Sequence, residues 1–185
     1  MKRPLVLIVT AVLIGLLAGP ANAKPDPRWH FYTHDKTYYT SPWYAAGHRI
    51  MVPFGCTRAP YYDPDPRCSD NHGYHHGLDI AMGCGTRLFA GINAWVVDPG
   101  DLGPAYGTSP LRLRNYVKGV DVVIGHTRTV YVQPGDRLHK GDLIALASDN
   151  GAPDGCHLHF EVRDQSGSLS TARWPKPLLN LSAAG

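Results

Sequence analysis

Short apolar runs separated by turn residues fill the chain from residue 51 onward. Runs of this kind, bounded by Gly, Pro, Asn and Asp, are typical of β-strands. They predict strands over 78–82, 88–97, 111–117, 120–124, 129–132, 143–147 and 157–162. Lys118-Gly119, between two of these runs, is a two-residue hairpin signal. After residue 23 no window of about eleven residues sustains helical periodicity. The pattern therefore predicts an all-β fold of antiparallel sheets, without long helices.

Residues 1–23 have the organisation of a secretory signal peptide. Lys2 and Arg3 precede an apolar run from Leu5 to Leu17, and Ala21-Asn22-Ala23 supplies the small-residue cleavage pattern. The run is too short, and too closely followed by that pattern, to indicate a membrane span. We therefore expect a product that acts outside the cytoplasm and has no membrane segment after signal removal.

The rest of the chain divides near residue 50. Residues 24–50 are polar and aromatic without a clear period, and we interpret them as an extended N-terminal arm lying over the domain. Residues 51–181 form the predicted domain, and the mature length suffices for one well-buried core. We expect a monomer with no cell-wall-binding module appended.

Composition narrows the choice of partner. The formal charge of the whole chain is +3, and the signal region contributes two of these charges through Lys2 and Arg3, so the mature charge is about +1. Such a balance gives no reason to expect nucleic acid as a partner. With 20 Gly and 16 Pro, the chain is rich in turns.

Four cysteines follow the signal region: Cys56, Cys68, Cys84 and Cys156. An even number in an exported chain favours disulfides, and four cysteines permit three connectivities. Cys56 and Cys68 bracket a loop rich in Pro and Asp, so a local bridge is the simplest closure and leaves Cys84 to pair with Cys156. The alternative, thiolate metal ligands, lacks the support of a C-x-x-C spacing.

Histidine carries the candidate chemistry. His75 and Asp79 form an H-x-x-x-D pattern that enters a predicted strand, and His157-Leu158-His159 is an H-x-H on the last one. Residues i and i+2 share one face of a strand, so both imidazoles of the H-x-H project together while Leu158 and Phe160 point to the core. Two imidazoles and a carboxylate suit a divalent ion such as zinc.

Each pattern alone is common in unrelated proteins, and either one alone would favour ordinary surface or hydrogen-bonded histidines. Their combination in one small exported β domain favours a metal site. Three protein ligands with a fourth position for water are typical of a catalytic zinc site rather than a structural one.

With these motifs the chain resembles the lysostaphin-type (LytM-like) zinc metallopeptidases, enzymes that cut peptides in bacterial peptidoglycan. The resemblance covers about residues 52–180 and runs in order through four segments. Pro53-Phe54-Gly55 comes first, then HHGLDIAMGCGTRLFAGINAWVV, VVIGHTRTVYVQPGDRLHKGDLIALA and GCHLHFEV. It implies a compact, sandwich-like peptidase domain in the cell envelope or outside the cell.

Carried over residue by residue, the resemblance makes His75, Asp79 and His159 the ligands of one Zn²⁺ ion, and His126 and His157 two catalytic histidines that do not bind it. We expect His157 to act as general base and acid. His126 is then expected to hydrogen-bond the oxyanion or to position the water. The implied activity is a zinc endopeptidase acting on peptidoglycan stem or cross-bridge peptides.

The chain departs from the family pattern at Cys156, which stands where the family often has Pro, and at Cys84 after the first metal-bearing strand. A bridge between them would tie the two metal-bearing strands together. Two rival functions remain open: a catalytically silent member that binds cell wall or activates another hydrolase, and an extracellular zinc-sequestering protein. In some relatives an upstream segment covers the zinc, so an inhibitory role for the arm is a further hypothesis.

Overall fold

The computed structural model describes residues 24–185, so the predicted signal peptide lies outside the described residues. Strands dominate this part of the chain. In order they are β1 Tyr38–Ser41, β2 Tyr44–Val52, β3 Gly55–Thr57, β4 Gly73–His75, β5 Leu78–Ala81, β6 Arg87–Phe89, β7 Ala94–Val97, β8 Leu111–Asn115, β9 Val120–Gly125, β10 Thr127–Arg128, β11 Arg137–Leu138, β12 Leu143–Ala147, β13 His157–Asp164 and β14 Ser182–Ala183. The described helical segments are short: the 3₁₀ turns Pro104–Tyr106 and Leu169–Thr171 and helix α1, Lys176–Leu179.

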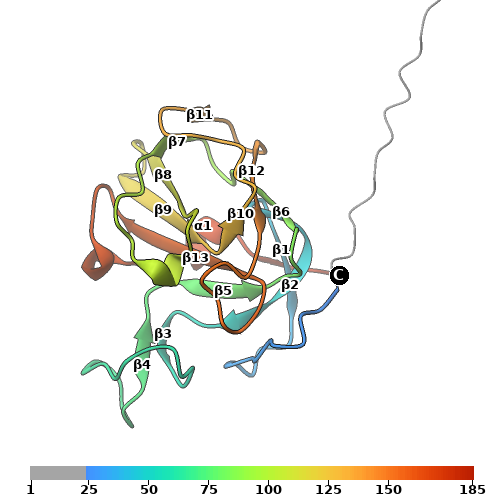
Figure 1. The fold of residues 1–185 in the computed structure, drawn as a ribbon, viewed down its shortest axis with the longest axis vertical. Coiled ribbons are helices and arrows are strands. Elements are labelled where there is room, and N and C mark those ends of the chain that lie inside the picture. The colour runs from blue at the N-terminus through green and yellow to red at the C-terminus, as the bar shows by residue number, and fades with distance from the viewer. Residues whose placement is uncertain (1–23) are drawn as a thin grey trace, which may run out of the picture.

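Twelve strands form one curled sheet in which every pairing is antiparallel (Figure 1). The order across the sheet is β10-β12-β6-β2-β5-β13-β9-β8-β7-β11, and β1 joins β2 to β14. Strands β3 and β4 pair separately and project from one end (Figure 1). The predicted antiparallel all-β class is confirmed.

The hydrophobic core lies inside the curl. Trp43 is 1% exposed and meets the ring of Phe160 edge to face, with centroids 4.8 Å apart. The Trp43 indole also donates a hydrogen bond of 2.9 Å to the carbonyl of Leu178, which satisfies its polar group. Leu158 and Phe160 of β13 belong to this core, as the alternation of the H-x-H strand predicted.

Several strand boundaries differ from the prediction. The run over 88–97 is broken into β6 and β7 at Gly91, where a Cβ would lie 2.3 Å from the Trp43 indole. Thr129 has φ 48°, which ends the extended backbone, so the prediction of a strand over 129–132 was wrong and β10 ends at Arg128. The β8–β9 hairpin exists, but Asn115 pairs with Val120, so its loop has four residues rather than two.

The segment 24–50 contains more regular structure than an extended arm. Strand β2 pairs with β5 and β6 inside the main sheet, and Trp43 is a core residue. The sequence of β2 does not alternate between apolar and polar residues as a half-buried strand does, because the exposure of its residues does not alternate. Residues 24–37 are the part without a strand, and the division at residue 50 stays a prediction.

No helix within residues 24–185 combines the length and apolar character that a membrane crossing needs.

We expect Trp43→Ala to lower the free energy of unfolding by about 3–5 kcal/mol, because it removes a fully buried indole and leaves a cavity beside Phe160. Denaturant unfolding of the oxidised protein measures this loss. The exposed Trp95, which is 41% accessible, provides the matched control, and Trp95→Ala should cost less than about 1 kcal/mol. Equal losses for the two variants would contradict the assignment of Trp43 to the core.

Candidate metal centre and active site

Three buried side chains meet between β4, β5 and β13. His75 is the last residue of β4, and Asp79 lies four residues later in β5. In the antiparallel pairing of β5 with β13, Asp79 stands directly opposite His159, so both project from the same face of the sheet. His75 is 1% exposed, Asp79 is 2% exposed and His159 is 8% exposed.

The donor atoms of this group are close together. His75 Nε2 lies 3.2 Å from His159 Nδ1, His159 Nδ1 lies 2.9 Å from Asp79 Oδ1, and His75 Nε2 lies 3.4 Å from the same oxygen. Ligands bound tetrahedrally at the usual zinc distances are about 3.4 Å apart. The set therefore matches the spacing and the chemistry of a zinc shell.

Outer partners fix which nitrogen of each ring is free to bind a metal. His75 Nδ1 donates to the carbonyl of Pro53 at 3.0 Å, which leaves a lone pair on Nε2. His159 Nε2 lies 3.4 Å from a carboxylate oxygen of Glu161, which leaves the lone pair on Nδ1. Such outer hydrogen bonds are usual for histidines that bind metals. Both free nitrogens belong to the closely spaced group.

Electrostatics also favour a cation here. Burial opposes ionisation of Asp79, but His75, His157 and the hydrogen bond from His159 outweigh it and hold the pKa of this carboxyl well below its usual range. Burial likewise disfavours a charged His159, yet its bonds to Asp79 and Glu161 raise the pKa of this imidazole to about 9. The carboxylates thus stabilise positive charge within the group.

His126 and His157 lie beside this group. Their ring centroids are 4.3 Å apart, and the His126 ring is 5.9 Å from that of His159. His126 Nδ1 bonds the carbonyl of Asn150 at 2.8 Å, and His157 Nδ1 bonds that of Gly155 at 2.9 Å. Because a carbonyl only accepts, both rings donate through Nδ1 and keep a lone pair on Nε2 when neutral.

The environments of these two histidines differ. Burial, followed by the neighbouring His157 and His159, lowers the pKa of His126 to about 3, so this ring stays neutral near neutral pH. His157 instead has carboxylates on both sides: Asp79 Oδ1 lies 3.7 Å from its Nε2 and Asp154 Oδ1 lies 3.6 Å from its Nδ1. His157 therefore lies between two carboxylate groups.

His126 is held in a strained conformation. Its φ is 55°, in the left-handed region that non-glycine residues seldom adopt. Its N–H donates to the carbonyl of Tyr106 at 3.0 Å, and its own carbonyl accepts from the N–H and hydroxyl of Ser148, both at 2.8 Å. Strain of this kind persists where surrounding contacts fix it, and it often marks a functional site.

A buried polar network behind His159 was not predicted from the sequence. Glu161 accepts from the hydroxyl of Tyr106 at 2.7 Å and from the guanidinium of Arg163 at 2.5 Å, and Arg163 also donates to that hydroxyl at 2.9 Å. The sequence could have indicated Glu161, because it lies two residues after His159 and therefore on the same face of the strand. Tyr106 ends the 3₁₀ turn Pro104–Tyr106, which is distant from β13 in sequence, and no local pattern indicates it.

Two neighbouring histidines lie outside the group of donor atoms around His75. His76 Nε2 lies 3.0 Å from a guanidinium nitrogen of Arg67, and His72 lines a surface cavity of about 470 Å³ between the arm and the disulfide loop. Tyr74 packs edge to face on Phe54, with centroids 5.5 Å apart. Tyr62 was missed: its hydroxyl lies 3.4 Å from Asp79 Oδ2.

Both predicted disulfides are present. Cys56 is bonded to Cys68 and Cys84 to Cys156, with Cα–Cα distances of 5.5 and 5.2 Å. The second bridge joins the turn after β5 to the residue before β13, so it links the two strands that carry Asp79 and His159.

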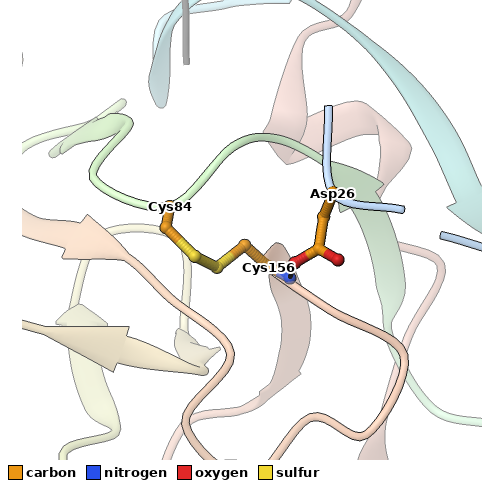
Figure 2. A group of neighbouring side chains, drawn as sticks. All are labelled: Asp26, Cys84 and Cys156. Atoms are coloured by element: carbon orange, nitrogen blue, oxygen red, sulfur yellow. Dashed lines mark hydrogen bonds between the residues drawn. A yellow bond between two sulfur atoms is a disulfide. The ribbon is translucent and has the colours of Figure 1, made fainter. Parts of the chain in front are cut away.

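A second cluster of possible ligands consists of Asp26, Cys84 and Cys156 (Figure 2). Its sulfur atoms are bonded to each other, so neither is a thiolate. The Asp26 carboxylate is occupied by hydrogen bonds from Arg28 and from the N–H of Cys156. The His75 group is therefore the better candidate metal centre.

Comparison with known proteins identifies curated relatives of this chain. Two curated relatives are each 30% identical over 125 residues, which is 67% of this chain: glycyl-glycine endopeptidase ALE-1 of Staphylococcus capitis (34% of its length) and lysostaphin of Staphylococcus simulans (25%). The chain thus spans about a third or less of these relatives.

Solved structures share the fold. LytU superposes with a TM-score of 0.59 at 27% identity, covering 73% of this chain and 86% of that one. The catalytic domain of lysostaphin from Staphylococcus simulans superposes with a TM-score of 0.56 at 27% identity, covering 72% and 92%. The sequence pattern of peptidase family M23 matches residues 73–171, which include all five histidine and aspartate residues of the site. The chain belongs to peptidase family M23.

Proposed function

We propose that this protein is an exported zinc-dependent endopeptidase that hydrolyses peptide bonds in bacterial peptidoglycan. The observation that carries the proposal is the convergence of His75, Asp79 and His159, with donor atoms within 3.4 Å of one another, beside two further histidines. A zinc-sequestering protein would need the first three residues but not the second pair.

Bound zinc would supply Lewis acidity, polarising the scissile carbonyl and making water acidic near neutral pH. In this proposal His75, Asp79 and His159 hold the ion, and the remaining chemistry belongs to His126 and His157.

His157 is the proposed general base. Its Nε2 lone pair can accept the proton of the attacking water, and Asp79 and Asp154 stabilise the imidazolium that forms. The same nitrogen then carries the proton that the leaving amine requires. Its hydrogen bond to Gly155 keeps a proton on Nδ1, so Nε2 is the nitrogen that gains and loses a proton.

His126 is proposed to position the water. Its Nδ1 proton is committed to Asn150, so its neutral Nε2 accepts a hydrogen bond and does not donate one to an oxyanion. Of the two roles expected for His126, the acceptor role therefore fits the geometry better. The buried, neutral ring orients a water without taking its proton.

The substrate class rests on the relatives. Because ALE-1 is described as a glycyl-glycine endopeptidase, a glycine-rich cross-bridge is the first substrate to test, with stem-peptide cross-links as the second.

Purified protein should release new amino termini from isolated peptidoglycan, lose this activity with a zinc chelator and regain it when zinc is returned. Mass spectrometry of the released fragments identifies the bond cleaved. Binding to peptidoglycan without cleavage would instead support a catalytically silent family member that binds cell wall. Tight zinc binding without peptidoglycan binding or cleavage would support a zinc-sequestering protein.

His126→Ala and His157→Ala should each retain one zinc per chain and lose about 10²–10⁴-fold in kcat/KM, because each removes a group that acts on the water. His75→Ala, Asp79→Ala and His159→Ala should lose the zinc. Metal analysis and peptide cleavage assays separate the two classes. His139→Ala is the control, since the His139 side chain is 72% exposed and lies outside the site. Loss of zinc from the His157 variant would contradict its assignment as a residue that does not bind the metal.

Gly77→Ala should weaken zinc binding by about tenfold or more, because a Cβ at this position would lie 2.5 Å from the His159 ring and displace it. Gly47→Ala is the matched control, since its Cβ meets no atom nearer than 3.3 Å. Competition with a chromogenic chelator measures both affinities. Equal affinities in the two variants would show that the His159 position tolerates the displacement.

A further inference from the structure

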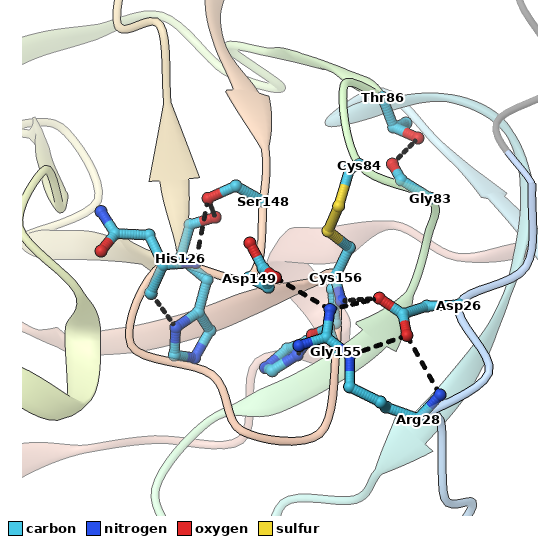
Figure 3. Close-up of a disulfide and its surroundings, with 12 residues drawn as sticks. Asp26, Arg28, Gly83, Cys84, Thr86, His126, Ser148, Asp149, Gly155 and Cys156 are labelled. Carbon is cyan, nitrogen blue, oxygen red and sulfur yellow. Dashed lines mark hydrogen bonds and ion pairs between the residues drawn. A yellow bond between two sulfur atoms is a disulfide. The ribbon is translucent and has the colours of Figure 1, made fainter.

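Two side chains of the N-terminal segment bind the backbone of the residue that precedes the H-x-H. The Asp26 carboxylate accepts a hydrogen bond of 3.1 Å from the N–H of Cys156, and the Trp29 indole donates one of 2.6 Å to its carbonyl. Both polar groups of the Cys156 backbone are thus occupied by residues about 130 positions earlier in the chain. Figure 3 shows Asp26 pointing at Cys156, the last residue of the loop 149–156, next to the Cys84–Cys156 disulfide.

Arg28 extends the contact to the other end of the same loop. Its guanidinium donates to Asp26 at 2.7 Å and to Asp149 at 2.8 Å (Figure 3). The side chains of Arg28 and Asp149 are 46% and 45% exposed, so solvent screens this ion pair. The Asp26 side chain is only 9% exposed. Asp26 and Trp29 therefore supply the stronger part of the attachment.

The loop that these residues hold, 149–156, supplies the Nδ1 partners of both proposed catalytic histidines. The carbonyl of Asn150 accepts from His126, and that of Gly155 accepts from His157. These bonds leave each ring with its lone pair on Nε2. A change in the position of the loop would move both rings at once.

Gly155 allows the close approach of the arm. A Cβ at this position would lie 2.6 to 2.8 Å from the Asp26 carboxylate, and its φ of +94° favours glycine. Trp29 also packs, with Phe31 and Tyr32, against a small buried cluster that includes Met51 and Val52. The arm is therefore seated on the domain by apolar contact as well as by hydrogen bonds.

We propose that Asp26, Arg28 and Trp29 form a clamp that positions loop 149–156, and through it the rings of His126 and His157, for hydrolysis. The clamp residues are positioning residues, and the proposal rests on the proposed function of the site. It assigns the arm an activating role. Among residues 24–185, the group of possible ligands around His75 includes no side chain of the arm.

Asp26→Ala and Trp29→Phe, each in the full chain with both disulfides intact, test the clamp. Both should keep one zinc per chain and lower kcat about 10–100-fold with little change in KM, as expected when a partner outside the metal shell is lost. Asp35→Ala is the matched control: Asp35 is also hydrogen-bonded within the arm, to Thr37 and Tyr39, but does not contact the loop. Its kcat should equal that of the wild type.

A second measurement does not require peptidase activity. In the zinc-loaded protein, the Nδ1 proton resonances of His126 and His157 should broaden or shift in Asp26→Ala and Trp29→Phe, and amide exchange over 149–156 should accelerate. Asp35→Ala should change neither. If the wild type cleaves no peptidoglycan but these signals move, the proposed function fails, whereas the positioning of loop 149–156 and of both rings by the clamp residues is supported. Unchanged ring resonances, or an increase in kcat, would overturn the clamp, and the increase would favour an inhibitory arm.

Discussion

The antiparallel pairing of β5 with β13 determines the geometry of the site. It places Asp79 opposite His159 and points both toward His75, which is only four residues from Asp79 along the chain. A shift of one residue in this register would turn Asp79 or His159 to the other face of the sheet. The shift is opposed because the alternate residues Leu158 and Phe160 are packed in the core. Apolar burial on one face thus fixes the polar geometry on the other.

Burying so many ionisable groups requires compensation. Asp79 is matched by surrounding imidazoles, and Glu161 by Arg163 and Tyr106, so no carboxylate of this network lies in the interior without a partner. Unpaired, such groups would cost several kcal/mol each. Of these contacts, that of Glu161 with His159 also selects the tautomer of the ring. The backbone carbonyls of Pro53, Asn150 and Gly155 select the tautomers of His75, His126 and His157.

Loop 149–156 connects the elements that the chemistry would need. It is joined to the turn after β5 by the Cys84–Cys156 bridge, to the arm by Asp26 and Trp29, and to the two histidines by its carbonyl groups. Loops near active sites are usually mobile and require support from a rigid scaffold. Here the support comes from three distant parts of the chain.

Alternation within strands and short sequence spacing made much of this protein predictable. The all-β class, the inward Leu158 and Phe160 and both disulfide pairs follow from local patterns and spacing. The choice of His75, Asp79 and His159 as one group is what the resemblance to the lysostaphin-type peptidases implied. Tertiary structure alone decided the rest. Strand β2 has no alternating exposure because its neighbours bury it unevenly, and Tyr62, Tyr106 and the Asp26–Cys156 contact join segments far apart in sequence. Local periodicity reports which face of an element is buried, whereas a contact between distant loops depends on the three-dimensional path of the whole chain.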